Sequence, residues 1–312
     1  MKKLAFMFPG QGSQEPGMGK SFYHQDASIK RIYDEANQLL NKDITRLMFE
    51  GPADVLTETE NAQPALLLSS IAIHTLLLKE EIQPVMTVGH SLGEYSALVA
   101  AGSLSLEEAL PLVATRGKLM EEAFPKGQGT MAAVLGMKQG EIENVIEKVE
   151  NGAVDLANIN CPGQIVISGA KEGIEEAKDL LKEAGAKRVL PLNVSGPFHS
   201  RLMKSANEAF AEHLNKVTIR DASIPVYANV SAQPVTDHKE IKDLLIKQLY
   251  SPVRFEESIR NMMESEVDAF VEIGNGKVLS GLVKKINRRT KTFAVQDIDS
   301  LNEFIRWNKE ET

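Results

Sequence analysis

Residues 84–100 decide how this chain folds, because they combine an apolar strand, a tight turn and a helix. They read Pro84-Val85-Met86-Thr87-Val88-Gly89-His90-Ser91-Leu92-Gly93-Glu94-Tyr95-Ser96-Ala97-Leu98-Val99-Ala100. The five residues from Gly89 to Gly93 match G-x-S-x-G, a pattern that places a serine at a sharp strand-to-helix turn. Such a turn exposes the serine hydroxyl near the free N–H groups of the helix, which stabilise negative charge. The stretch predicts a nucleophile elbow with Ser91 as the catalytic nucleophile.

The segments around this elbow alternate between apparent strands and helices. Short apolar runs indicate strands at 4–8, 226–228, 269–273 and 292–295, and helical periodicity indicates helices at 29–40, 64–78 and 106–124. This alternation is typical of a parallel sheet covered by helices. The sequence therefore predicts an α/β fold whose larger domain is α/β-hydrolase-like, with a mostly parallel sheet.

The order of elements changes after the breaker cluster at 125–129. The expected order is then strand, helix, strand, strand, helix and strand, at 131–135, 141–149, 154–159, 164–168, 174–184 and 188–193. This βαββαβ order is that of the ferredoxin-like unit. We expect an inserted ferredoxin-like subdomain at 129–194 and a discontinuous catalytic domain made of 1–128 and 195–312.

Composition excludes several classes of protein. The 312 residues are 43% apolar and 25% charged, which suffices for a full globular core. The single cysteine, Cys161, excludes an internal disulfide, and the scattered histidines show no zinc-ligand spacing, so we expect no metal and a reduced, cytoplasmic setting. No run approaches the roughly 18 apolar residues of a membrane helix. The net charge of −8 disfavours nonspecific nucleic-acid binding, so neither a membrane nor a nucleic acid is expected as a partner.

A serine nucleophile needs a base, and histidine is the usual one near neutral pH. His199 lies in the loop 195–200, at the predicted domain junction and ahead of a helix, and we prefer it to a purely structural helix-start histidine. His90 adjoins Ser91, but neighbours on a tight turn usually point apart. His74 lies in an apolar helix, where a structural role is favoured. Polar segments without a supporting motif contain His24, His213 and His238.

The acid that normally orients such a histidine has no obvious candidate. In the hydrolase order it lies between Ser91 and His199, where Asp155 and Asp179 are among the possibilities. Asp155 falls in a strand and Asp179 in a helix of the predicted insertion, so neither is well placed. The residues suggest a Ser-His dyad that is oriented by another group, such as a main-chain carbonyl.

Two glycine-rich turns invite a nucleotide-binding interpretation, but neither satisfies the pattern. The first, Gly10-Gln11-Gly12, has Glu15 where G-x-G-x-x-G requires glycine. The second, at 274–277, has valine at both 271 and 278, where a P-loop requires glycine and a hydroxyl residue. We interpret both as turns at strand ends, and Gln11 remains available to line an acyl site.

Seven motifs are spread over nearly the whole chain. They are Phe8–Gln14, Gln63–Ala65, Gly89–Glu94, Arg116-Gly117, Asn160 with Pro162–Gln164, Gly196–Ser200, and Gln248-Leu249 with Pro252-Val253. Together and in this order they resemble the malonyl-CoA:acyl carrier protein transacylase family of bacterial type II fatty acid synthesis. No position among them departs from the family pattern.

The resemblance implies roles for the residues of the reaction centre. Ser91 is the acylated nucleophile and His199 its base, and the second ring nitrogen of the histidine faces the main-chain carbonyl of Gln248. The main-chain N–H groups of Gln11 and Leu92 form the oxyanion hole.

The resemblance also implies substrate-binding residues. Arg116 pairs with the free carboxylate of the malonyl group, which agrees with the bidentate way in which a guanidinium grips a carboxylate; a solvated surface arginine is the alternative. Phe198 resembles the malonyl-selective form of its motif. Gln63 and Asn160 line the site, although helix capping or core hydrogen bonding explains them equally well.

The implied reaction transfers malonyl from malonyl-CoA to the phosphopantetheine thiol of acyl carrier protein, through a malonyl-serine and with ping-pong kinetics. It supplies the extender unit for fatty acid synthesis, needs no cofactor, has malonyl-CoA and acyl carrier protein as partners, and is expected of a monomer. A serine hydrolase and a noncatalytic carrier-protein-binding module are the alternatives. The missing acid and Arg116 disfavour the first, and the intact Ser91 and His199 disfavour the second.

Overall fold

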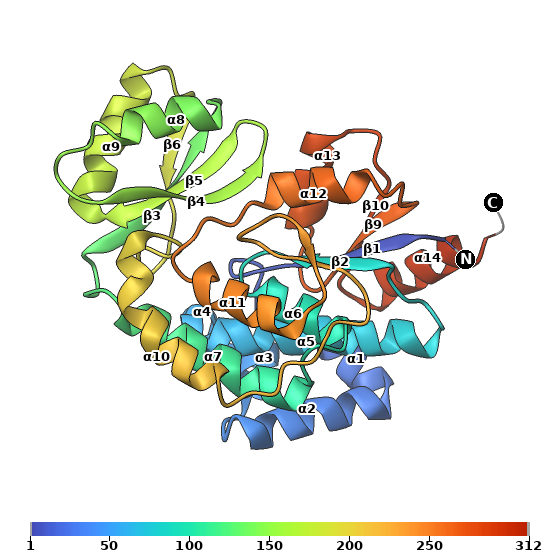
Figure 1. Cartoon of the computed structure of the whole chain (residues 1–312). Coiled ribbons are helices and arrows are strands. Elements are labelled where there is room, and N and C mark those ends of the chain that lie inside the picture. The colour runs from blue at the N-terminus through green and yellow to red at the C-terminus, as the bar shows by residue number, and fades with distance from the viewer. Residues whose placement is uncertain (1, 311–312) are drawn as a thin grey trace.

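The computed structural model describes residues 2–310 and contains two sheets (Figure 1). The larger sheet has the strand order β10-β9-β1-β2-β7-β8, and every pairing is parallel except β7 with β8. Its strands are β1 (Leu4–Phe8), β2 (Met86–Gly89), β7 (Val226–Tyr227), β8 (Pro234–Val235), β9 (Ala269–Ile273) and β10 (Thr292–Val295). The predicted α/β fold with a mostly parallel sheet is confirmed.

Helices cover both faces of this sheet, and the alternation of side chains along β1 shows how. Leu4, Phe6 and Phe8 point into a large core shared with α5, α6 and α7, whereas Ala5 and Met7 point into a second core shared with α12 and α13. The helices are α1 (Lys20–Gln25), α2 (Ala27–Leu39), α3 (Ile44–Glu50), α4 (Ala53–Thr57), α5 (Thr59–Lys79), α6 (Gly93–Ala100), α7 (Leu106–Glu122), α10 (Lys204–Leu214), α11 (His238–Gln248), α12 (Phe255–Met263), α13 (Val278–Ile286) and α14 (Ile298–Lys309). Successive residues of a strand face opposite sides, so a strand buried on both faces reads as a continuous apolar run.

The smaller sheet is antiparallel and has its own apolar core. It contains β3 (Gly129–Leu135), α8 (Gln139–Ile146), β4 (Val154–Cys161), β5 (Gln164–Ala170), α9 (Lys171–Glu183) and β6 (Arg188–Pro191). The chain order βαββαβ is the one predicted for the ferredoxin-like unit, and the strands lie in the spatial order β4-β5-β3-β6. The domain limits at 128/129 and 194/195 stay a prediction.

Main-chain hydrogen bonds join the smaller sheet to the rest of the protein. Ile159 N donates to Val253 O over 2.8 Å, and Val253 N donates to Ala157 O over 2.8 Å. The segment that follows α11 thereby extends the sheet beside β4. Next to this pairing, a groove lies between the small sheet and the segment 250–254.

The longest helix, α5, begins earlier than its sequence suggests. Apolar periodicity predicted the helix at 64–78, a start that also suits proline, which is common in the first turn of a helix. The structure starts the helix at Thr59 and includes Pro64 within it. Length and hydropathy would allow α5 to cross a membrane, but 83% of its most apolar window is buried inside the protein. That burial is typical of a core helix.

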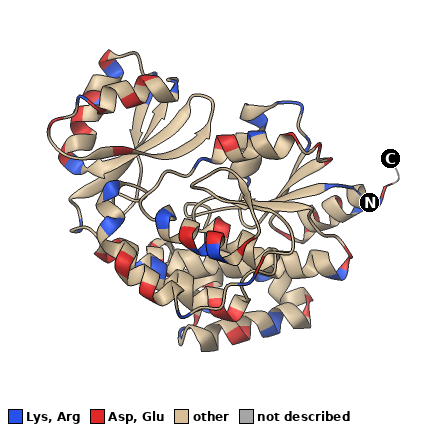
Figure 2. Cartoon of the chain, in the orientation of Figure 1, with Lys and Arg blue, Asp and Glu red and all other residues tan. Residues whose placement is uncertain are grey.

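Charged residues of both signs are interspersed along the helices (Figure 2), and most charged side chains are not buried. Glu272 of β9 is an exception, because it is fully buried. Its two carboxylate oxygens accept hydrogen bonds from Leu279 N (3.0 Å) and Ser280 N (2.8 Å), at the start of α13. A carboxylate of the chain itself thus occupies the place where a P-loop would bind phosphate.

Two glycines allow the elbow to pack directly on β1. A Cβ atom at Gly93 would overlap the main-chain oxygen of Phe8, and one at Gly89 would overlap the main chain of Gly93. These contacts are between backbone atoms, which cannot rotate away. The glycines of G-x-S-x-G are therefore required by the close approach of β1, β2 and α6.

We expect Gly93→Ala to destabilise the protein by at least about 1–3 kcal/mol, the usual cost of overpacking a core. The free energy of unfolding in urea measures this. Gly140→Ala is the matched control, because a Cβ there meets no atom within 4 Å and the site lies in α8; it should leave stability unchanged or raise it. Equal stabilities of the two variants would contradict the packing argument.

Candidate active site

Ser91 occupies the turn between β2 and α6 in a backbone conformation that non-glycine residues rarely adopt. Its φ angle is 52°, and such left-handed conformations cost on the order of 1–3 kcal/mol when they are held in place. The N–H of Ser91 donates to the side-chain oxygen of Asn229 over 2.8 Å. The predicted elbow is thus present, and the buried side chain of Asn229 holds the turn in this strained conformation.

Ser91 and His199 contact each other directly. Ser91 Oγ lies 2.7 Å from His199 Nε2, and His199 Nδ1 lies 3.0 Å from the main-chain oxygen of Gln248. A carbonyl oxygen only accepts hydrogen bonds, so Nδ1 carries the proton of the neutral ring and Nε2 is left to accept from the serine. The fold brings together a serine, a histidine and an orienting carbonyl without a carboxylate in the third place.

His199 is buried, with 4% of its surface exposed. Burial is the main reason that its pKa falls to about 3, and the nearby positive charge of Arg116 lowers it further. Since a lowered pKa leaves histidine neutral above that value, the ring is unprotonated at neutral pH. It is therefore in the form that accepts a proton.

Arg116 of α7 is buried within the same cluster, so it is not a solvated surface arginine. It donates from Nη1 to Gln63 Oε1 (2.8 Å), and from Nη2 to Gln248 Oε1 (3.0 Å) and Ser91 Oγ (3.2 Å). Its Nε–H has no partner among residues 2–310. The guanidinium thus places a buried positive charge beside the serine hydroxyl.

Gln11 and Leu92 flank the serine from different elements. Gln11 follows β1, and Leu92 precedes the first residue of α6, which begins beside β1. Within residues 2–310, the main-chain N–H of neither residue donates a hydrogen bond. Both N–H groups are consequently available for an oxyanion at this end of the sheet.

The three remaining residues expected to line the site differ in their relation to the cavity at Ser91. They are Phe198, Gln63 and Asn160. This cavity has a volume of about 140 Å³ and is lined by Phe198, among others. Gln63 is buried, does not line the cavity, and accepts a hydrogen bond from Arg116 Nη1. Asn160 of β4 lies 2.8 Å from His90 Nε2 through its Oδ1, and so connects the small sheet to the elbow.

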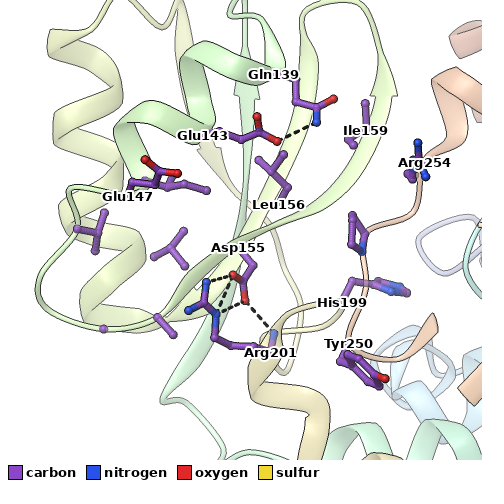
Figure 3. A pocket seen from close by; sticks show the side chains of 16 residues that line it. Gln139, Glu143, Glu147, Asp155, Leu156, Ile159, His199, Arg201, Tyr250 and Arg254 are labelled. Atoms are coloured by element: carbon purple, nitrogen blue, oxygen red, sulfur yellow. Dashed lines mark hydrogen bonds and ion pairs between the residues drawn. The ribbon is translucent and has the colours of Figure 1, made fainter. Parts of the chain in front are cut away.

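A larger groove reaches His199 from the other side. It has a volume of about 740 Å³ and lies between the small sheet, the segment 250–254 and the start of the helical turn at Arg201–Met203. Figure 3 shows His199 at one wall and the Asp155–Arg201 pair near it. The histidine thus separates a small cavity at the serine from an open groove.

The alternative candidates are engaged elsewhere. Asp155 accepts hydrogen bonds from the Arg201 side chain and main chain, and Asp179 is an exposed residue near Lys182. His74 packs edge-on against Phe6 in the core, and burial lowers its pKa to about 4. His90 contacts Asn160 rather than the serine. None of them occupies the place of base or acid beside Ser91.

Sequence reasoning missed two residues of this cluster, Asn229 and Glu94. Asn229 comes two residues after β7, the parallel neighbour of β2, so its side chain meets the elbow. A polar residue at the carboxyl end of a strand is a signal that could have found it. Glu94 follows Gly93 directly but is buried, which its charge argued against.

A group of three possible metal ligands, Asp221, Asp237 and His238, lies at the start of α11 and was not anticipated. Asp237 caps α11 by accepting from Lys239 N and Glu240 N, and His238 Nδ1 lies 2.7 Å from Asp221 Oδ1. These contacts explain why the three residues lie close together: they hold the start of helix α11.

Comparison with known proteins agrees with this site. The model of the acyl transferase domain family matches residues 5–309. A malonyl CoA-acyl carrier protein transacylase of Bacillus subtilis (strain 168) is 55% identical over 313 aligned residues, which cover 100% of this chain and 99% of the relative. The chain belongs to the acyl transferase domain family. It is therefore an acyltransferase.

Solved structures of other acyltransferases have the same fold. The acyl carrier protein S-malonyltransferase of Vibrio cholerae is 43% identical, with a TM-score of 0.94 and coverage of 97% of this chain and 99% of that one. A malonyl-transacylase solved in complex with a type II polyketide synthase acyl-carrier protein is 40% identical, with a TM-score of 0.95 and coverage of 98% and 100%. The resemblance found in the sequence is confirmed.

The pKa of His199 yields a test by NMR. We expect the imidazole resonances of His199, assigned by their loss in His199→Asn, to stay at their neutral positions between pH 8 and pH 5, since the pKa is near 3. A titration midpoint near 6.5, the ordinary value for histidine, would contradict the argument from burial and the Arg116 charge.

Proposed function

We propose that this acyltransferase moves a malonyl group from malonyl-CoA to the phosphopantetheine thiol of acyl carrier protein through a malonyl ester of Ser91. The product is the extender unit for fatty acid synthesis. The observation that carries the proposal is the buried guanidinium of Arg116, 3.2 Å from Ser91 Oγ. The names of the similar proteins, and the solved complex of one of them with a carrier protein, support the choice of donor and acceptor.

The first half-reaction acylates the serine. His199 Nε2 takes the hydroxyl proton as Ser91 Oγ attacks the thioester carbonyl, and the main-chain N–H groups of Gln11 and Leu92 stabilise the oxyanion. When the intermediate collapses, the carbon–sulfur bond breaks and coenzyme A takes the proton from Nε2. Gln248 O holds Nδ1–H throughout and favours the charged ring while it exists.

The second half-reaction is the same chemistry in reverse order. The phosphopantetheine thiol gives its proton to Nε2 and attacks the malonyl-serine carbonyl, and the same N–H groups stabilise the oxyanion. The carbon–oxygen bond to Ser91 then breaks, and Oγ recovers the proton. Protons and electrons balance without any redox or metal cofactor, and the free enzyme between the two substrates makes the kinetics ping-pong.

Arg116 selects the acyl group by charge. Three of its five N–H groups contact Gln63, Gln248 and Ser91 Oγ, and Nη2, which lies 3.2 Å from Ser91 Oγ, is the donor beside the place where the acyl group is attached. The positive charge of Arg116 also disfavours the protonated form of His199. The negative charge of a malonyl carboxylate offsets the positive charge of Arg116, so His199 accepts a proton more easily and is a better base. An acetyl group carries no charge, so the protonated form of His199 stays disfavoured.

We also propose that the working unit is a monomer in the cytoplasm. Ser91, His199, Arg116 and Gln248 meet within one chain, so catalysis requires no residue from a second copy. Cys161 is a buried free thiol, which suits a reducing compartment.

Labelled malonyl-CoA tests the covalent intermediate. Incubation without carrier protein should label Ser91, detected by peptide mass spectrometry, and addition of holo acyl carrier protein should move the label to its thiol. Ser91→Ala should remain unlabelled. Release of the label as free malonate, with none on the carrier thiol, would indicate a hydrolase, and an unlabelled wild type that binds carrier protein would indicate a binding module.

Arg116→Ala tests the carboxylate clamp. A charged hydrogen bond contributes about 1.5–3 kcal/mol, so kcat/KM for malonyl-CoA should fall by about 10- to 100-fold, while that for acetyl-CoA should change by less than about 5-fold because acetyl has no carboxylate. Arg46→Ala is the matched control, since Arg46 is exposed on α3 and pairs with Glu50. Equal losses with both acyl groups would rule out the clamp.

A further inference from the structure

We propose that Asn229 and Glu94 are positioning residues for acyl transfer: Asn229 clamps both sides of the elbow, and Glu94 ties that clamp to Gln248, whose carbonyl orients His199. The proposal rests on the proposed function of Ser91 as the acylated residue. Neither Asn229 nor Glu94 lines the cavity at Ser91, so both act through their neighbours rather than on the substrate.

The Asn229 side chain contacts the main chain of Ser91 and that of Gly89, two residues earlier. Its Oδ1 accepts from Ser91 N over 2.8 Å, and its Nδ2 donates to Gly89 O over 2.6 Å. The two bonds span the turn in which Ser91 has a φ of 52°. A single side chain thus opposes relaxation of the turn toward an ordinary backbone conformation, which would redirect the hydroxyl away from His199.

Glu94 holds the clamp in place. Its Oε2 accepts from the main-chain N of Asn229 over 3.0 Å and from Gln248 Nε2 over 2.7 Å. Gln248 Nε2 also lies 3.2 Å from Asn229 Oδ1 and 3.1 Å from Ser91 O. One carboxylate therefore links the residue that shapes the elbow to the residue that orients the histidine.

Gln248 connects this network to the proposed acyl clamp as well. Its side-chain oxygen accepts from Arg116 Nη2 over 3.0 Å, and its main-chain oxygen contacts His199 Nδ1 over 3.0 Å. The amide side chain lies between the carboxylate of Glu94 and the guanidinium of Arg116. A displacement of Gln248 would consequently move the base and the guanidinium together.

The burial of these groups shows that the network is costly to maintain. Asn229 and Gln248 are fully buried, and Glu94 is 3% exposed. Burial raises the pKa of Glu94 to about 7, against the hydrogen bonds and the Arg116 charge that lower it. A carboxyl group in such a place must be held by donors to be tolerated, and here those donors are groups next to the reacting atoms.

The test replaces Asn229 by alanine and measures the single-turnover rate of Ser91 acylation by malonyl-CoA. Misplacement of reacting groups by about 1 Å costs about 100-fold in rate, so we expect kcat and the acylation rate to fall by about 10- to 100-fold. The KM for malonyl-CoA should stay within about 3-fold, because the substrate contacts remain. Inactivation by phenylmethylsulfonyl fluoride, a small serine reagent, should slow in parallel.

A second buried asparagine provides the matched control. Asn61 of α5 is 1% exposed, and its side chain donates to Val55 O and Glu58 Oε2, which are not part of the Ser91 network. Asn61→Ala should reduce thermal stability yet leave the acylation rate and the sulfonyl fluoride rate unchanged. If Asn229→Ala does not fold, Asn229→Asp keeps the side-chain volume but places an oxygen against Gly89 O, and should show the same loss of rate.

Glu94 is tested by a pair of variants. Glu94→Gln keeps an acceptor oxygen of the same reach and should retain the acylation rate within about 10-fold, whereas Glu94→Ala removes it and should lose about 100-fold, with KM again little changed. Wild-type rates in folded Asn229→Ala, or equal losses in kcat for Asn61→Ala, would overturn the positioning role. Absence of a Ser91 adduct in the wild type would instead overturn the proposed function.

Discussion

The hydrogen bond between His199 Nδ1 and the main-chain oxygen of Gln248 is the interaction on which the rest of the site depends. It leaves His199 Nε2 as the acceptor, and Nε2 lies 2.7 Å from Ser91 Oγ. A carboxylate in that position would raise the basicity of the ring more strongly, but a carbonyl adds no second charge to a cluster that already contains Arg116. The orienting group is therefore compatible with a site that is proposed to bind an anionic acyl group.

The buried charges of this cluster constrain one another. Arg116 lies against the face of Tyr95, with 5.3 Å between the guanidinium carbon and the ring centre, and Gln248 bridges it to Glu94. Burial without a partner is expensive for a charge, and a bridging amide supplies an acceptor to the cation and a donor to the anion. Burial lowers the pKa of His199 and raises that of Glu94, and the positive charge of Arg116 lowers both. Structure and reactivity of the site thus arise from the same set of contacts.

Much of the fold and the main pair of the site could be predicted from local patterns. The strand-turn-helix at Ser91, the βαββαβ order and the parallel sheet follow from apolar periodicity and turn residues, which act over a few positions. The start of α5 could not, because Pro64 suits a first turn and nothing local shows that residues 59–63 continue the helix. Asn229 and Glu94 were missed for a related reason: their significance lies in partners that are distant in the chain.

The sequence by itself determined the α/β class, the elbow, the choice of His199 over the other histidines, and the family, because each depends on residue types at fixed spacing. Only the tertiary structure decided what surrounds the serine. Ser91 and His199 are 108 positions apart, and Ser91 and Gln248 are 157 apart. The parallel pairing of β1, β2 and β7 and the packing of α7 and α11 bring their side chains within hydrogen-bond distance. Such contacts depend on three-dimensional geometry, and no local pattern records them.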